Sequence, residues 1–410
     1  MDMDTVTRKP ARWHYLIIGS LSMLFSGIIY AWSILKTPFS DEFGWTASQL
    51  ALNFTLIMCF FCMGGMVAGM LIKKNSPRVI VIVSAILACA GSILVSGMSG
   101  RNILMLYISY GFLCGSGIGM AYNVIIATVN SWFPDKKGTS SGILMMSFGA
   151  STLILGNIAS YMFRADNIGW RTTYMILGMA TGATLLVAAF LLRFPPASVQ
   201  LPKSSPNRKS NTGEDFETRD YTTSEMIRRF TFWRFFLFLI TLAATGSTVI
   251  SFAKDLAVNI GAAETLAITL VGVLSVFNGL GRIICGVMFD LAGRKKAMLF
   301  ANIVTISAPT LLLISVLTNT LITGILGLCL TGMSYGCAPT ISSAFISSFY
   351  GTRYFSLNFS IANTMLIPAS FTATLAGTLI GSTGSYVAPM VLLIVLAVIS
   401  LLLNLSIKRP

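Results

Sequence analysis

Arg282 is the charged residue of this sequence with the most apolar surroundings. It lies in the stretch 277–296, FNGLGRIICGVMFDLAGRKK, eight residues before Asp290. In a lipid bilayer an arginine costs about 2.5–3.5 kcal/mol at the centre of a spanning helix. Its planar guanidinium presents N–H donors in a fork that fits both oxygens of a carboxylate. The chemistry that this residue suggests is therefore the binding of an anion.

No acidic residue is placed to neutralise Arg282. All 14 Asp and Glu residues fall in predicted tails, loops or helix ends. We therefore expect an anionic substrate to be its partner. Two alternatives stay open. Backbone carbonyls and water could satisfy the guanidinium, or the side chain could reach the end of its helix, although ~12 Å separate it from Asp290 at the helical rise.

The other reactive side chains do not form a catalytic or metal-binding pattern. Cys59 and Cys62 form a C-x-x-C inside the apolar run LIMCFFCMGG, with no His, Asp or Glu nearby. Buried cysteines of this kind behave as small apolar residues. The single histidine, His14, lies at the edge of the first apolar run, where a structural role is the simpler interpretation. We predict no metal, no cofactor and no enzymatic activity, because an enzyme needs a nucleophile and base or a metal.

The elements that must position Arg282 are apolar helices. The chain has 410 residues, of which 55% are hydrophobic and 10% are charged, whereas a soluble domain has about 25% charged residues. Apolar runs of about 20 residues, long enough to cross a bilayer, recur along the chain. The net charge of +14 does not indicate nucleic-acid binding, because the basic residues lie between these runs. The composition predicts an all-α polytopic membrane protein in a lipid bilayer.

Twelve membrane-spanning helices are predicted, six on each side of a polar segment. This segment contains PPASVQLPKSSPNRKSNTGEDFETRD and is typical of a mobile linker. We predict an N-terminal six-helix bundle over residues 1–193, a cytoplasmic linker over 194–229 and a C-terminal six-helix bundle over 230–410. The predicted helices are 13–35, 47–72, 78–98, 103–130, 138–162, 171–193, 230–253, 264–289, 295–317, 321–349, 354–380 and 386–407.

Lysine and arginine residues set the predicted orientation. With both termini on the cytoplasmic side, 22 of the 28 basic residues fall in cytoplasmic segments, five fall in external segments and Arg282 lies within a helix. Cytoplasmic loops of membrane proteins carry an excess of basic residues. We therefore expect a multi-pass protein of the cell membrane with cytoplasmic N- and C-termini.

The two sets of six helices share traces of one pattern. The fourth helix contains GIGMAYN and the tenth contains TGMSYG, and both read G-M-x-Y. The second helix ends in G-x-x-x-G-MLIKK and the eighth in G-x-x-x-D-LAGRKK. Matches at corresponding positions favour two pseudo-symmetric bundles, as in transporters built from internal repeats.

The end of the eighth helix resembles a known signature. Gly286, Asp290, Gly293, Arg294 and Lys295 fit the pattern G-x-x-x-D-x-x-G-R-K of a cytoplasmic loop in the major facilitator superfamily. The resemblance covers the whole chain and implies two six-helix bundles that rock around a central site. It also implies that these five residues form a conformational-switch motif, which holds one of two states through contacts between neighbouring helices. The alternative is that the basic residues only set the orientation.

A narrower resemblance rests on the surroundings of Arg282. Asn278 one turn earlier, the first helix SGIIYAWSI and the turn WFPDKKG are similar to the oxalate–formate antiporter family and the wider monocarboxylate transporters. The resemblance implies that Arg282 holds the substrate carboxylate. Side chains of the first, fourth, tenth and eleventh helices would complete the pocket, although packing is an alternative role for the tyrosines. By position these are Tyr30, Tyr122, Asn123, Tyr335 and Asn363.

Two departures from these relatives bear on the substrate. Animal-type monocarboxylate transporters have Asp where this chain has Asn278, so the usual protonatable partner is missing. The oxalate transporter has a second cation, a lysine of its eleventh helix, and residues 354–380 contain no lysine. A site with a single cation matches a substrate with one carboxylate better than a substrate with two. Lys36, at the outer end of the first helix, either attracts anions to the entrance or is a solvated lysine of the membrane interface.

The predicted function is secondary active transport of small organic anions by alternating access. Monocarboxylates such as lactate, pyruvate or formate are the expected substrates, and the protein is expected to work as a monomer. Co-transport of a proton, exchange and uniport all stay open. Exchange of oxalate or another dicarboxylate for formate and carboxylate sensing at the membrane are alternative interpretations. A pump for hydrophobic cations is disfavoured, because the buried charge has the wrong sign.

Overall fold

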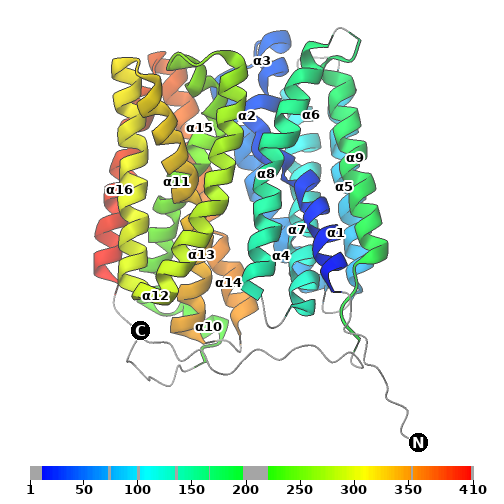
Figure 1. Ribbon diagram of the computed structural model, residues 1–410, viewed down its shortest axis with the longest axis vertical. Coiled ribbons are helices and arrows are strands. Elements are labelled where there is room, and N and C mark those ends of the chain that lie inside the picture. Colours follow the sequence, from blue (N-terminus) through cyan, green and yellow to red (C-terminus); the bar gives the residue numbers. More distant parts are fainter. Residues whose placement is uncertain are drawn as a thin grey trace, which may run out of the picture.

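The protein is a bundle of long helices that run side by side (Figure 1). The computed structural model describes residues 12–72, 75–98, 102–133, 137–165, 167–196, 220–351 and 354–407, and the backbone alone at 137–139, 141, 290, 347, 355 and 356. Over these residues, twelve spans are long and apolar enough to cross a membrane and no strand is formed. The predicted all-α polytopic fold with twelve spanning helices is confirmed.

Each half of the chain supplies six of the spans. The helices of the first half are α1 (Trp13–Ser26), η1 (Gly27–Ala31), α2 (Trp32–Leu35), α3 (Thr37–Phe43), α4 (Ala47–Leu71), α5 (Pro77–Ser96), α6 (Ile103–Leu106), η2 (Tyr107–Cys114), α7 (Gly115–Trp132), α8 (Lys137–Arg164) and α9 (Gly169–Leu191). Those of the second half are α10 (Thr223–Ile227), α11 (Phe230–Asn259), α12 (Glu264–Thr318), α13 (Leu321–Tyr350), α14 (Phe355–Asn363), α15 (Leu366–Thr383) and α16 (Val387–Ser406).

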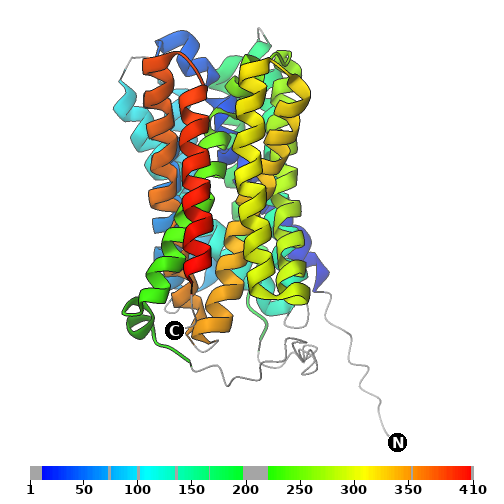
Figure 2. The ribbon, with the colours of Figure 1, turned by 90° about the vertical axis from the view of Figure 1, so that its left-hand side faces the viewer.

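The halves stand next to each other in Figure 1, with the first half on the right and the second on the left. Both chain termini lie at the bottom of this view, and α3 lies at the top. We call the end away from the termini, with α3 and the α8–α9 and α11–α12 turns, the distal end. In Figure 2, α16 runs along the outside of the second half, where it packs on α11 and α12. Its outer side chains are apolar and exposed, as a lipid-facing surface requires.

Two spans that were predicted as separate helices follow each other in α12 with a sharp break. The spans are Glu264–Phe289 and Leu291–Thr318, and Gly293 between them has φ 79° and ψ 169°. This region of backbone space is open essentially to glycine alone. The glycine of the predicted switch motif therefore sits where the chain reverses direction.

The last part of the predicted linker is folded onto the second half. Residues 197–219 lie outside the described part of the chain, and the predicted boundaries at 194 and 229 stay a prediction. At the end of this segment, the Tyr221 N–H donates to the Tyr350 carbonyl at 3.0 Å. The side-chain amide of Asn358 donates to the Tyr221 carbonyl at 3.1 Å. These bonds fasten the chain just before α10 to α13 and α14.

Backbone-to-backbone packing joins α12 to α13. A Cβ atom added at Gly332 or Gly336 of α13 would lie less than 3.0 Å from the carbonyl oxygen of Leu274 or Asn278, respectively. Small residues let spanning helices approach this closely. Glycine at these two positions therefore fixes the distance and rotation of α12 against α13.

The first half has the same close packing at glycines between α4 and α7. A Cβ atom at Gly119 would meet the backbone of Phe61, and one at Gly64 would meet the backbone of Ser116, both at less than 3.0 Å. The helix pairs α4–α7 and α12–α13 occupy corresponding positions in their halves. The G-M-x-Y similarity in the sequence thus coincides with a similarity in packing.

The halves touch along α4 with α15 and along α8 with α12. The Thr55 hydroxyl of α4 lies 2.7 Å from the Ser370 carbonyl and 2.9 Å from the Thr374 hydroxyl of α15. Gly272 of α12 packs against Leu153 of α8, leaving no room for a larger residue. A motion of one half against the other would have to break these contacts.

Replacing Gly293 by alanine should destabilise the fold, because a Cβ is strained at φ 79°. We expect a loss of about 1–3 kcal/mol in the free energy of unfolding, read as a lower midpoint of thermal unfolding for the detergent-solubilised protein. Gly286→Ala is the matched control. An alanine Cβ there would be in ordinary contact with Thr340 at 3.5 Å, so equal midpoints for both variants would contradict the prediction.

Replacing Gly336 by alanine should push α12 and α13 apart. The new methyl group would overlap the Asn278 carbonyl, and such overpacking costs about 1–3 kcal/mol. The same melting experiment measures this cost. Gly381→Ala, at a helical glycine with nothing within 4 Å of the added Cβ, should melt like the wild type. A Gly336→Ala protein as stable as this control would disprove the tight contact.

Candidate functional site

Arg282 lies on α12, and its guanidinium is incompletely satisfied. The side chain is partly buried, and its Nε donates to Asn278 Oδ1 at 3.4 Å, one turn earlier on the same helix. Its Nη1 is buried and has no hydrogen-bond partner among the described residues. No described carboxylate forms an ion pair with it. The guanidinium therefore still has an N–H group that can donate to a bound anion.

Tyr335 of α13 stands beside this arginine. Its side chain is 3% exposed, and its hydroxyl finds no hydrogen-bond partner in the described part of the chain. Gly336, the next residue, is where α13 packs against the Asn278 carbonyl. Pro339 has no N–H to donate to the Tyr335 carbonyl four residues earlier. Tight helix packing thus holds a second unsatisfied polar side chain next to Arg282.

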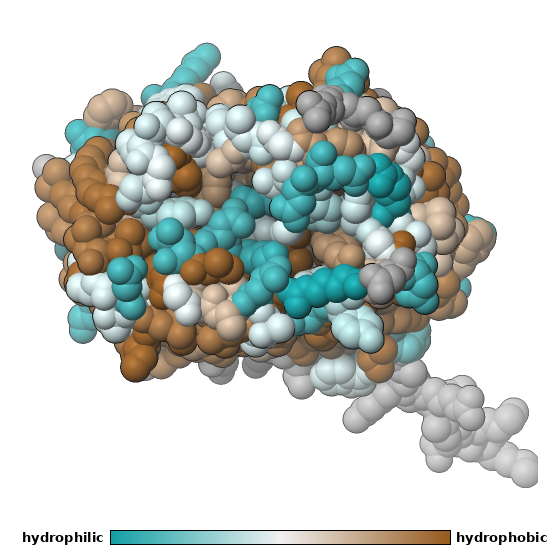
Figure 3. All heavy atoms as spheres, turned by 90° about the horizontal axis from the view of Figure 1, so that it is seen from above, coloured by the Kyte–Doolittle hydropathy of each residue, from teal (hydrophilic) through white to brown (hydrophobic). Residues whose placement is uncertain are grey.

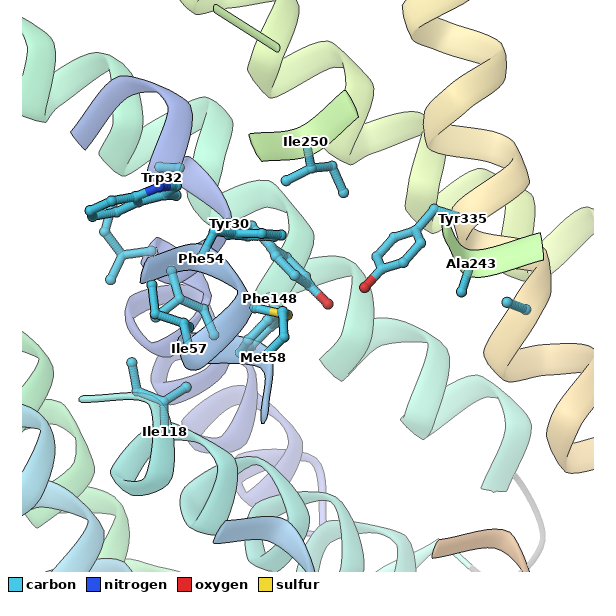
Figure 4. Close-up of a cluster of buried hydrophobic side chains, with 14 of the residues drawn as sticks. Tyr30, Trp32, Phe54, Ile57, Met58, Ile118, Phe148, Ala243, Ile250 and Tyr335 are labelled. Carbon is cyan, nitrogen blue, oxygen red and sulfur yellow. The ribbon is translucent and has the colours of Figure 1, made fainter. Parts of the chain in front are cut away.

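Tyr30 approaches the same place from the first half. It lies in η1, where α1 tightens into a 3-10 turn, and is 7% exposed. Its ring centroid is 6.2 Å from that of Tyr335, with the rings at 78°, and Figure 4 shows the two tyrosines directed toward each other. Arg282 interacts electrostatically with both hydroxyls. One tyrosine from each half therefore faces the other near the guanidinium.

Tyr122 of α7 joins this group through aromatic contacts. Its ring centroid is 5.2 Å from that of Phe148 on α8 and 5.2 Å from that of Phe61 on α4. Phe148 also contacts Tyr30, at 5.3 Å and 89°. The side chain of Asn123, the next residue, is exposed and packs on Gly65 of α4, one turn beyond Phe61. Its place in the pocket stays a prediction.

Asn363 ends α14 at a break in the eleventh span. The chain turns at Thr364 before α15 begins, and Pro368 cannot donate to the Thr364 carbonyl. The Cys62 thiol donates to the Asn363 carbonyl at 3.9 Å, while Asn363 Oδ1 is buried without a partner among the described residues. The place of the Asn363 side chain in the pocket stays a prediction.

Interrupted helices therefore supply part of the site, as they do in many transporters. Three side chains near it were not predicted: Phe61, Cys62 and Phe148. Cys62 was read only as an apolar residue, and the described residues around Cys59 and Cys62 hold no group of metal ligands. The two phenylalanines carry no charge or spacing signal in an apolar helix, so the sequence offered no means of finding them.

The predicted switch motif lies at the break of α12. Gly293 forms the break, and the Arg294 guanidinium lies over the ring of Phe349 on α13, 5.2 Å from its centroid. Lys295 is exposed. The side chain of Asp290 lies outside the described part of the structure. Arg294 thus links the two ends of neighbouring helices, and the role of the motif as a switch stays a prediction.

The assembled groups are donors for an anion. One guanidinium N–H of Arg282 and the Tyr335 hydroxyl are buried donors without a partner among the described residues, and leaving such groups unpaired costs free energy. The unpaired atom of Asn363 is its amide oxygen, which accepts and does not donate to an anion. An anion with two oxygens can bind the guanidinium, while the aromatic rings enclose a small apolar part. Among these residues, no base is placed to activate a nucleophile.

The sequence matches the profile of the Major Facilitator Superfamily over residues 15–252 and 234–410. It is 25% identical over 354 residues to the uncharacterized MFS-type transporter YhjX of Escherichia coli (strain K12), covering 86% of this chain and 84% of that protein. It is 26% identical over 288 residues to the oxalate:formate antiporter of Oxalobacter formigenes, covering 70% and 65% of the two chains. Monocarboxylate transporter 2 of Mus musculus is 24% identical over 401 residues, covering 91% and 79%.

Solved structures show the same fold. A bacterial homolog of the human lysosomal transporter Spinster superposes with a TM-score of 0.68 at 18% identity, over 98% of both chains. A D-xylose-proton symporter gives 0.71 at 12% identity, over 97% of both chains. With its twelve spans, its paired halves and a profile match along nearly the whole chain, this protein belongs to the major facilitator superfamily and is a multi-pass membrane transporter.

Proposed function

We propose that the protein is a secondary active transporter of small monocarboxylates, of the lactate, pyruvate or formate type, whose carboxylate binds Arg282. The observation that carries the proposal is the buried Arg282 Nη1, which has no partner among the described residues. A charge in this position needs a counter-ion. Relatives named as an oxalate:formate antiporter and monocarboxylate transporters support a carboxylate as that counter-ion.

Because the site contains one cation, Arg282, a substrate with one carboxylate is favoured over a substrate with two. Asn278 and the two tyrosines around Arg282 are neutral, and residues 355–383 of α14 and α15 contain no lysine or arginine. The second carboxylate of oxalate would lie among aromatic rings without a cation, and a buried unpaired charge is unfavourable. Because Asn278 is not titratable, proton symport would require the substrate to bring the proton, and exchange needs no proton.

The transport cycle that we propose is alternating access between the two halves. Tyr30 and Tyr335 face each other across their boundary at 6.2 Å, so rocking one half against the other would open and close the site. The excess of basic residues in the segments on the side of the termini supports cytoplasmic termini, and the distal end would then be the external end in a cell membrane.

Arg282→Ala should reduce uptake of radiolabelled lactate or formate into proteoliposomes. A hydrogen bond to a charged group contributes about 1.5–3 kcal/mol, so we expect kcat/KM to fall by about ten- to a hundredfold. Arg282→Lys should recover part of this loss, since it keeps the charge but not the fork.

Arg234→Ala is the control for this experiment. Arg234 lies near the start of α11 and donates to the Ser406 carbonyl at 2.9 Å, twelve residues before Gly246, where α11 meets Tyr335. Uptake by this variant should stay near that of the wild type. If Arg282→Ala folds and transports as well as Arg234→Ala, the carboxylate does not bind at Arg282.

Monocarboxylates should raise the midpoint of thermal unfolding of the purified protein more than dicarboxylates, because a ligand stabilises the state that it binds. Formate, lactate and pyruvate would be compared with oxalate at equal ionic strength, each also with Arg282→Ala. A larger shift with oxalate would favour the dicarboxylate–formate exchanger. Stabilisation by organic cations instead would overturn the anion hypothesis.

A further inference from the structure

Helix α11 is built from small residues where it passes the central site. Residues 243–248 read AATGST, and all six are buried. Ala243, Gly246 and Ile250 are three and four residues apart, so they share one face of the helix. Figure 4 shows Ala243 and Ile250 beside the two facing tyrosines. This face of α11 therefore forms a wall of the site, although none of its residues is charged.

Gly246 determines where the Tyr335 side chain lies. A Cβ atom at Gly246 would be less than 3.0 Å from the Cβ, Cγ and Cδ2 atoms of Tyr335, so this side chain rests directly on the backbone of α11. On its other side, α13 is held against the Asn278 carbonyl of α12 by Gly336. Tyr335 is thus fixed between two helices, with its ring directed toward Tyr30.

Ile250 covers the two tyrosines on the distal side. It lies one turn of α11, about 6 Å, nearer to the distal end than Gly246, and it is 2% exposed. Figure 4 shows its side chain above Tyr30 and Tyr335. Here α11 contacts both η1, which carries Tyr30, and the following α2. The distal face of the molecule beyond this layer is hydrophilic in the middle and apolar at its rim (Figure 3).

Arg282 approaches the same tyrosines from the opposite direction. A Cβ atom at Gly336 would lie 3.1 Å from the Arg282 backbone nitrogen, so the arginine starts at the level of Gly336. Helical side chains point toward the N-terminus of their helix, which for α12 is the distal end. A carboxylate bound to the guanidinium would therefore direct its apolar tail past the Tyr335 ring toward Ile250.

We propose that α11 limits the length of the substrate, with Gly246 as a positioning residue for Tyr335 and Ile250 as the end of the pocket. The inference rests on the proposed function, because the carboxylate at Arg282 sets the point from which length is counted. Formate has no tail and does not reach Ile250. An unbranched acid of four carbons does, so short monocarboxylates are the class that fits.

Ile250→Ala should shift the preference toward longer acids. Uptake of formate, acetate, propionate and butyrate into proteoliposomes, corrected for protein-free liposomes, gives kcat/KM for each. One methylene in an apolar pocket changes kcat/KM by about tenfold or more, so the butyrate-to-formate ratio should rise at least about tenfold. Leu237→Ala truncates an exposed residue of the same helix and should keep the wild-type ratio. An Ile250→Ala ratio equal to this control would overturn the proposal.

Gly246→Ala should change the same ratio in the opposite direction. Its methyl group displaces Tyr335 toward Tyr30, so butyrate should lose about tenfold more kcat/KM than formate. Gly327→Ala is the matched control, because its Cβ would lie 2.8 Å from Leu312 side-chain atoms, eight residues and about 12 Å before Tyr335 on α13. This control should melt earlier than the wild type and keep its ratio.

Opposite shifts in Ile250→Ala and Gly246→Ala cannot come from a general loss of stability, which lowers uptake of all four acids alike. A wild-type ratio in folded Gly246→Ala would overturn the positioning role. If that variant does not fold, the ratio of Ile250→Ala decides the proposal alone.

Thermal unfolding gives a readout that does not depend on transport. Butyrate should raise the unfolding midpoint of Ile250→Ala more than that of the wild type, because a better-fitting ligand stabilises the state that it binds. Formate should raise both midpoints equally. Equal shifts with butyrate would overturn the length limit.

The two proposals can fail separately. If Arg282→Ala loses uptake and Ile250→Ala keeps the wild-type ratio, the length limit is wrong and the carboxylate site stands. If Ile250→Ala changes the ratio while Arg282→Ala transports normally, the carboxylate does not bind at Arg282 and the wall formed by α11 stands.

Discussion

The guanidinium of Arg282 lies among apolar helices, and its charge constrains which residues can pack around it. Arg282 is partly buried, bonds through Nε to the Asn278 side chain, and keeps Nη1 free of any described partner. None of the recorded ion pairs of the described residues gives Arg282 a carboxylate, although the chain has 14 acidic residues. Three acidic residues that form ion pairs in the described part of the chain, Glu42, Asp255 and Glu264, lie at the distal end. The distribution of charge therefore leaves the centre of the molecule positive and unpaired, which is what a site for an anion requires.

The geometry of this site depends on close helix packing more than on polar contacts. Gly332 and Gly336 bring α13 against the backbone of α12, so that Tyr335 and Arg282 share one layer. Tyr30 reaches the same layer from a 3-10 turn in the first half. Since the two tyrosines belong to different halves, a motion between the halves changes the site directly. In the transport cycle that we propose, this arrangement would couple binding to the conformational change.

The sequence was sufficient to predict the helices. Runs of about 20 apolar residues have few stable solutions in a bilayer other than helices, and the twelve predicted spans agree with the structure. Tyr30, Tyr122, Asn123, Tyr335 and Asn363 were named through a family resemblance. In the structure Tyr30 faces Tyr335 and contacts Phe148, which also contacts Tyr122, whereas the adjacent Asn123 packs on Gly65. A difference of one residue on a helix turns a side chain by about 100°, since 3.6 residues complete a turn.

The sequence alone determined the number of spans, the superfamily signature and the presence of a single arginine at depth, because hydropathy and charge are properties of the residues themselves. Tertiary structure decided which partners those residues have. Lys36 and Asp255 are more than 200 positions apart, and no local pattern predicts that they meet at 2.6 Å. The sequence could not identify Phe148 as a site residue for the same reason. An apolar residue in an apolar helix becomes part of a site only through the neighbouring helices that its side chain contacts.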